Sequence, residues 1–200
     1  MTAPAPGSER RIALIAVGPR EYTAVERDGE DREVERTPLA AEQLAAWVSS
    51  VEAADGPRWI IRSAGEIYAT LLRDGVRLGR SHDLVLCHAI LRDTASVASP
   101  LAPSAAWERR EPMTAAPSLF DVFDDESGDD AVDGALEQYR AQRRVLSASA
   151  DGRLTLLCAA ESAGGLIAEE MRIAGLPWDE GVHDAILTAT LGTRPVAGGL

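Results

Sequence analysis

The chain has 200 residues, 46% of them hydrophobic and 26% charged, which predicts one folded module with a packed core and excludes wholesale disorder or a collagen-like chain. All 20 basic residues are arginine, and the formal net charge of −12 opposes a phosphate backbone, which disfavours a free-standing nucleic-acid binder. The first apolar run is far shorter than the roughly 20 residues of a membrane span, so we expect a cytoplasmic protein without membrane contact.

The amino-terminal part of the chain predicts strands followed by a helix. Residues 11–18 form a continuous apolar run typical of a buried strand. Residues 22–36 predict a solvent-facing hairpin with its turn at Asp28 and Gly29. The pair Thr37-Pro38 predicts the cap and first turn of an amphipathic helix that continues to about residue 54.

Strand and helix signals continue to residue 93. Residues 58–61 predict a short buried strand, and the spacing Ser63-x-x-Glu66 predicts a capping box at the start of a second helix that stops at Gly75. Residues 82–92 predict a third helix. Residues 1–93 are therefore expected to form a mixed sheet flanked by helices, of the α/β or α+β class.

The second half of the chain predicts a loop and then helices. Residues 94–130 are rich in Pro, Ala, Ser and acids without EF-hand spacing, which predicts a mobile loop with a solvated charge run rather than a calcium site. Residues 131–150 predict a helix. Residues 151–200 predict two connecting helices, at 153–174 and after Asp179.

The helix predicted at 153–174 carries apolar and small side chains at helical spacing. We expect one face of it to pack against the domain, and its small residues to let a neighbouring backbone approach closely. The residues of that face are Leu157, Ala160, Gly164, Ile167 and Met171.

Cysteines and histidines give no catalytic or metal pattern. Cys87 and Cys158 have neither a CxxC spacing nor a local histidine partner of the kind found in zinc sites, so we expect two buried thiols. His82, His88 and His183 are dispersed, and a histidine on an apolar helix face, such as His88, is more often a core residue than a base.

Two pieces of the chain resemble family A DNA polymerases, the DNA polymerase I family. Residues 59–91 are similar to the middle of the proofreading-exonuclease domain, where a short strand leads into an Asp-x-x-Leu helix; they read WIIRSAGEIYATLLRDGVRLGRSHDLVLCHAIL. Residues 158–179 are similar to the segment that joins exonuclease to polymerase; they read CAAESAGGLIAEEMRIAGLPWD. Residues 118–121, Ser-Leu-Phe-Asp, match a loop of the actinobacterial group called bifunctional 3′-5′ exonuclease/DNA polymerase.

The resemblance implies an RNase H-like 3′-5′ exonuclease fold, with the last helices leading toward a polymerase thumb. Such exonucleases hold two divalent metals with four carboxylates. The Asp-x-Glu pair of the family's first strand is missing from residues 11–18. Glu66 is the only acid near the second ligand position, and in the final motif Tyr139 is retained while Arg143 replaces the aspartate.

Two acids have a structural explanation as well. Glu66 is expected to fold back onto the Ser63 amide in the capping box. Asp83 is expected to cap the helix that follows it rather than to bind a metal. We therefore expect no cofactor in this chain, and Mg²⁺ only in a polymerase domain that lies outside it.

The expected function is that of the amino-terminal part of a DNA-directed DNA polymerase in replication or repair, with an inactive exonuclease-like domain as scaffold. The resembling protein is a nucleotidyltransferase, but residues 1–200 lack its active site, and DNA contact is expected through the polymerase domain. The alternative is a non-catalytic interaction module. Its loop residues Leu119 and Phe120 resemble peptides with which polymerases bind the sliding clamp.

Overall fold

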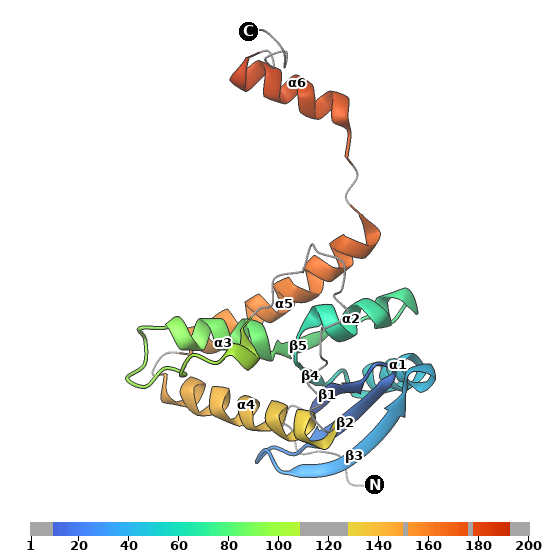
Figure 1. Cartoon of the computed structure of the whole chain (residues 1–200), viewed down its shortest axis with the longest axis vertical. Helices are drawn as coiled ribbons and strands as arrows, with labels where there is room; N and C mark the ends of the chain where they lie inside the picture. Colours follow the sequence, from blue (N-terminus) through green and yellow to red (C-terminus); the bar gives the residue numbers. More distant parts are fainter. Residues whose placement is uncertain (1–9, 109–127, 150–151, 176–177, 193–200) are drawn as a thin grey trace, which may run out of the picture.

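The computed structural model describes residues 10–108, 128–149, 152–175 and 178–192, which form a mixed α/β structure around one five-stranded sheet (Figure 1). The strand order is β3-β2-β1-β4-β5. The central strand β1 pairs antiparallel with β2 and parallel with β4. The strands are β1 Arg11–Gly18, β2 Glu21–Arg27, β3 Glu33–Ala40, β4 Arg58–Ile61 and β5 Arg80–Asp83. The predicted mixed sheet flanked by helices is thereby confirmed.

Helices cover both faces of the sheet and its β5 edge. In Figure 1, α1 and α2 lie on one side of the sheet, α4 lies on the other, and α5 runs beside α2 and α3. A single 3-10 turn, η1, follows α3. The helices are α1 Ala41–Asp55, α2 Ala64–Arg73, α3 Leu84–Asp93, α4 Gly128–Ala148, α5 Arg153–Ala174 and α6 Glu180–Leu191, with η1 at Ala105–Trp107.

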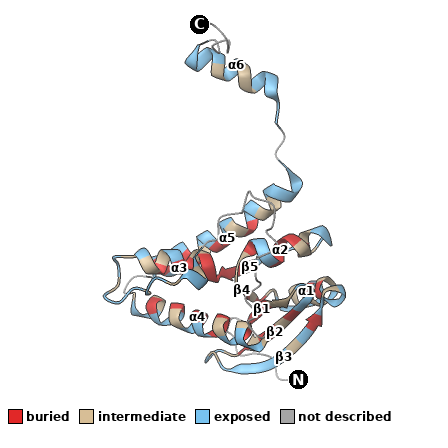
Figure 2. Cartoon of the chain, viewed as in Figure 1, coloured by how far each residue is buried: buried red, intermediate tan, exposed pale blue. Residues whose placement is uncertain are grey.

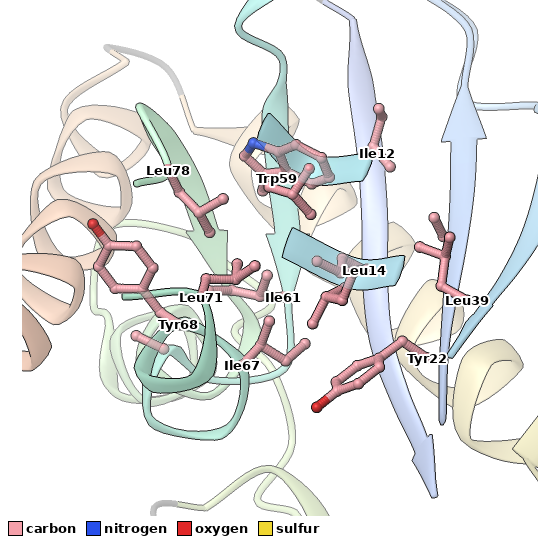
Figure 3. Close-up of a cluster of buried hydrophobic side chains, with 14 of the residues drawn as sticks. Ile12, Leu14, Tyr22, Leu39, Trp59, Ile61, Ile67, Tyr68, Leu71 and Leu78 are labelled. Atoms are coloured by element: carbon pink, nitrogen blue, oxygen red, sulfur yellow. The ribbon is translucent and has the colours of Figure 1, made fainter. Parts of the chain in front are cut away.

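The alternation of β1 divides the core into two layers. Ile12 and Leu14 point to the α1/α2 side and pack with Trp59, Ile61 and Ile67 (Figure 3). The intervening residues of β1 point to the opposite side, where α4 covers them. That second layer contains Ala13, Ile15, Val25, Ile60, Leu84, Val132, Ala135, Leu136 and Tyr139.

Two helix starts differ from the sequence-based predictions because strand pairing extends further than local signals indicate. Pro38 lies inside β3 opposite Thr23, and α1 begins only at Ala41. The missing amide of a proline is tolerated there because β3 is the edge strand of the sheet. Ser81 and His82 pair with β4, so α3 begins at Leu84 instead of residue 82.

The first part of the segment predicted as a mobile loop packs against the domain. Val97 and Leu101 are partly buried against the cluster formed by α3, α4 and α5, and Trp107 against the cluster under α4. The Leu101 amide donates to the Leu91 carbonyl at 3.0 Å. Three side chains of residues 94–108 thus pack partly against the domain, although most residues of this segment are exposed, and its mobility stays a prediction. Residues 109–127 lie outside the described part of the chain.

Helix α5 buries a different face from the one predicted. Leu154, Cys158, Ser162 and Leu166 are buried, whereas Leu157, Ile167 and Met171 are exposed (Figure 2). The helix has apolar residues on both sides. The side that carries Gly165 packs against the domain because the missing side chain leaves room for Leu86: a Cβ on Gly165 would lie only 2.8 Å from Leu86 Cδ1. The close neighbour at Gly165 is the Leu86 side chain and not a backbone, and a Cβ on Gly164, on the predicted face, would meet nothing within 4 Å.

No helix in the described ranges is long and apolar enough to cross a membrane.

Candidate functional site

The carboxyl ends of the parallel strands are where open α/β sheets usually bind ligands. Here β1 ends at Gly18, β4 ends at Ile61, and β5 ends at Asp83. The same edge would have to hold the metals of an exonuclease of the kind that the sequence resembles. The side chains at this edge therefore decide which chemistry is available.

Arg62 occupies the edge directly after β4. Its Nε donates to Glu66 Oε1 at 3.1 Å, and its Nη2 donates to the Ala106 carbonyl at 2.7 Å. Its guanidinium carbon lies 4.9 Å from the centroid of the Trp107 ring, within the range of a cation–π contact. A fixed positive charge thus lies at the edge where an exonuclease of that kind would hold its metal ions.

Glu66 does not form the predicted capping box. Ser63 is the N-cap of α2 but makes no side-chain capping bond, and the Glu66 carboxylate pairs with Arg62 instead. The guanidinium attracts the carboxylate more strongly than a backbone amide does, since its bond has charge on both partners. The prediction that Glu66 folds back onto the Ser63 amide is therefore wrong.

Asp83 is completely buried at the end of β5 and caps two helices. Its Oδ1 accepts from the amides of Val85 at 3.1 Å and Leu86 at 3.0 Å, at the start of α3. Its Oδ2 accepts from the Ala64 amide, at the start of α2, at 2.8 Å. Burial raises the pKa of Asp83 to about 6, although these backbone bonds oppose the rise. The predicted cap of α3 is confirmed, and the hydrogen bonds of the Asp83 carboxylate all go to backbone amides at helix starts.

The end of β1 has apolar groups and one nearby carboxylate, that of Glu21, whose Oε2 lies 3.4 Å from the position of a Cβ built on Gly18. Val17 packs against the start of α4, where a Cβ added to Gly128 would lie 3.1 Å from Val17 Cβ. Among the described residues, no group of three or more His, Cys, Asp or Glu side chains could hold a metal ion. The two carboxylates missing from the sequence of this strand are thus not replaced from elsewhere in the described chain.

Tyr139 and Arg143 lie away from this edge. The Tyr139 ring is buried edge-on against His82, with centroids 5.2 Å apart, and the charge of Arg11 at the start of β1 acts on its hydroxyl. Arg143 is exposed one turn further along α4. Because α4 runs antiparallel to β1, the structure places both residues toward the amino ends of the strands and does not bring them together with Glu66.

Histidines under α3 and α4 belong to buried hydrogen-bonded pairs that the sequence did not indicate. His82 Nε2 lies 2.7 Å from Gln142 Oε1, and burial lowers the pKa of His82 to about 4. His88 Nδ1 lies 2.8 Å from Gln138 Nε2, and burial lowers the pKa of His88 as well. Both glutamines lie on α4 far along the chain, so only long-range packing creates these pairs.

The two thiols are buried, as predicted, and lie on adjacent helices. Cys87 Sγ is 3.4 Å from Ser162 Oγ and 3.7 Å from the Cys158 carbonyl oxygen. The Cys158 side chain and burial together raise the pKa of Cys87, which keeps it protonated at neutral pH. A protonated, inaccessible thiol is a poor nucleophile.

Leu119 and Phe120, the predicted partner-binding residues, lie outside the described residues, so clamp binding stays a prediction. In comparisons with protein-family models, curated proteins and solved structures, no match to this chain was found.

Proposed function

We propose that this chain is a non-catalytic scaffold domain of a family A DNA polymerase, with an RNase H-like 3′-5′ exonuclease fold that has lost its metal site. The observation that carries the proposal is the position of Arg62 at the strand edge, where its guanidinium bonds to Glu66 and to the Ala106 carbonyl and lies over the Trp107 ring. The order of the strands and the helices on both faces agree with the fold that the sequence resemblance implies.

The chemistry of 3′-5′ hydrolysis explains why this edge is inactive. One metal must activate a water molecule while the other stabilises the leaving oxygen, and both need carboxylate oxygens as ligands. At this edge Glu66 is already neutralised by Arg62, and Asp83 uses both oxygens on backbone amides. Neither carboxylate is available to a metal without breaking the start of a helix or an ion pair.

We expect no release of nucleotides from a 3′-labelled single-stranded oligonucleotide incubated with the purified chain and Mn²⁺. The Glu66→Ala protein should give the same result, because the Glu66 carboxylate is held in an ion pair with Arg62. Product separation on a denaturing gel measures the release. Nucleotide release by the wild type that disappears in Glu66→Ala would show that Glu66 is a metal ligand and would refute the proposal.

A second candidate function, a protein-interaction module, is favoured by the outer face of α5. Leu157, Ile167 and Met171 are 51%, 56% and 45% exposed, and their helical spacing places them on one side of α5. Contiguous exposed apolar surface of this kind marks interaction sites in soluble proteins. In the scaffold proposal the same face would contact the polymerase region, whereas in a free-standing module it would contact a separate protein.

The outer face of α5 is expected to make the purified chain self-associate at high concentration. The double variant Leu157→Asp/Ile167→Asp should stay monomeric, with a free energy of unfolding within about 0.5 kcal/mol of the wild type because both positions are exposed. Sedimentation velocity over a concentration series measures the association. Val34→Asp, at a 61% exposed position on β3, is the matched control and should associate like the wild type. Association unchanged in the double variant would exclude this face.

A further inference from the structure

A small hollow lies between α1 and the strands β1, β2 and β3, on the face of the sheet opposite α4. Its volume is about 120 Å³, well below the roughly 300 Å³ at which sites for drug-sized molecules begin. It can therefore hold one side chain or a small ion, but not a nucleotide. The residues that line it and decide its chemistry are Arg10, Ile12, Glu26, Glu35, Trp47 and Val51.

The strand register explains why these groups lie together. Ile12 of β1 pairs with Glu26 of β2, and Glu26 pairs with Glu35 of β3, so all three side chains project to the same face. That face is the α1 side, because Ile12 belongs to the core cluster there. Trp47 and Val51, one turn apart on α1, line the hollow from the helix. The hollow thus combines apolar groups, an indole ring and two carboxylates.

One of the two carboxylates is neutralised and the other is not. Arg10 Nε and Nη2 donate to the two oxygens of Glu26 at 2.9 and 2.6 Å, and Arg10 Nη1 donates to Asp55 at 2.5 Å. In the part of the chain that the structure describes, no arginine pairs with Glu35, which is directly opposite Glu26 in the register. Like charges directly opposite each other destabilise a strand pair, so a cation beside Glu35 would stabilise this end of the sheet.

A carboxylate and an indole ring in one hollow favour a guanidinium group over other cations. This planar group can donate two parallel hydrogen bonds to a carboxylate, and its weakly hydrated face packs on an aromatic ring. The chain itself contains such an arrangement, in which Arg62 bonds to Glu66 and lies over the Trp107 ring. The hollow offers the same two kinds of group, Glu35 and Trp47, for an arginine from outside.

We propose that the hollow between α1 and β3 binds the guanidinium group of an arginine side chain on a partner protein, with Glu35 as the ion-pair partner and Trp47 as the aromatic contact. The net charge of −12 attracts a basic partner. A peptide is favoured over a free cation because β3 is the edge strand, so an extended peptide can pair with its outer backbone groups. The site shares no residue with the Arg62 edge or the outer face of α5, and it does not depend on the scaffold function.

Titration of the isotope-labelled chain with the blocked peptide acetyl-glycyl-arginyl-glycine amide, followed by nuclear magnetic resonance, tests the site. The indole N–H signal of Trp47, identified by its loss in Trp47→Phe, should shift on binding. The same peptide with citrulline in place of arginine keeps the shape without the charge and should leave the signal in place. Glu35→Gln should raise the Kd of the arginine peptide about fivefold, the upper range for an exposed ion pair. Glu35 is exposed, so this variant is expected to fold.

The control variant Glu137→Gln removes the same charge from an exposed position on α4, on the other face of the sheet, and should keep the wild-type Kd. No shift of the Trp47 signal in the wild type, an equal Kd in Glu35→Gln, or an equal shift with the citrulline peptide would overturn the proposal. Methylguanidinium chloride distinguishes the sources of the group. It should bind about tenfold more weakly than the peptide, because it cannot pair with β3. Equally tight binding of methylguanidinium would overturn the assignment to a partner protein.

Discussion

Replacing Asp83 with alanine is expected to lower the free energy of unfolding by about 3 kcal/mol, because the substitution removes caps from α2 and α3 together. The amides of Ala64 and Leu86 lose their acceptor, whereas the Val85 amide still donates to the Arg62 carbonyl at 3.1 Å. Asp83→Asn keeps a carbonyl oxygen of similar size and should cost clearly less. Urea unfolding followed by circular dichroism measures both changes. Equal losses in the two variants would show that packing, rather than capping, explains the contribution of Asp83.

The pH dependence of the free energy of unfolding provides an independent measurement of the pKa of Asp83. Its pKa is raised from 3.8 to about 6 in the folded protein, so the folded state binds the proton more tightly than the unfolded state does. This stabilisation is complete below pH 3.8 and is lost as the pH rises through 6. Between pH 4 and pH 7 the wild type should therefore lose up to about 3 kcal/mol relative to Asp83→Asn. Other acids titrate equally in both proteins and cancel in the difference, so a difference that does not vary with pH would show that the pKa of Asp83 is not raised.

Trp59→Ala is expected to destabilise the domain by about 4 kcal/mol, since it leaves a large cavity under α1. The Trp59 ring is fully buried (Figure 3). It stands edge-on to Trp47, with centroids 6.0 Å apart. Its Nε1 donates to Glu52 Oε1 at 2.8 Å, and the same oxygen accepts from the Gly79 amide. The substitution therefore also weakens the contact between α1 and the loop before β5.

Chemical denaturation of Trp59→Ala and of a matched Trp178→Ala variant provides the comparison. Trp178 is 67% exposed, so its loss should change the free energy of unfolding by about 0.5 kcal/mol or less. Similar losses in the two variants would mean that the layer between the sheet and α1 is not the main hydrophobic core. A loss near 1 kcal/mol for Trp59→Ala would mean that the neighbouring side chains collapse into the cavity.

The features that the sequence determined by itself depend on local chemistry. The apolar runs at β1 and β4 predicted buried strands because their residues cannot face water on either side. Asp83 and Asp179 predicted helix starts because a short acceptor side chain reaches the amides of the next turn, and both caps are present. The lack of an acid in β1 likewise needed only the sequence.

Several features depend on partners that are distant in the chain. Glu66 had a local partner in Ser63 and a competing one in Arg62, and the carboxylate pairs with the charged side chain. Pro38 had a local helix signal, but pairing of β3 with β2 extended the strand through it. The second cap made by Asp83 exists only because β4 and β5 are neighbours, which places the start of α2 beside the end of β5.

The tertiary structure alone decided which side of α5 is buried and where the arginines lie. Apolar residues recur at helical spacing on both sides of α5, so the sequence does not distinguish the two sides. The close fit of Gly165 against Leu86 determines which side is buried. Arg11, Arg58 and Arg80 each begin a strand and Arg27 ends one, and the pairing of the strands places these four residues side by side. Only the register aligns them, because a shift of one residue would turn each side chain to the other face of the sheet.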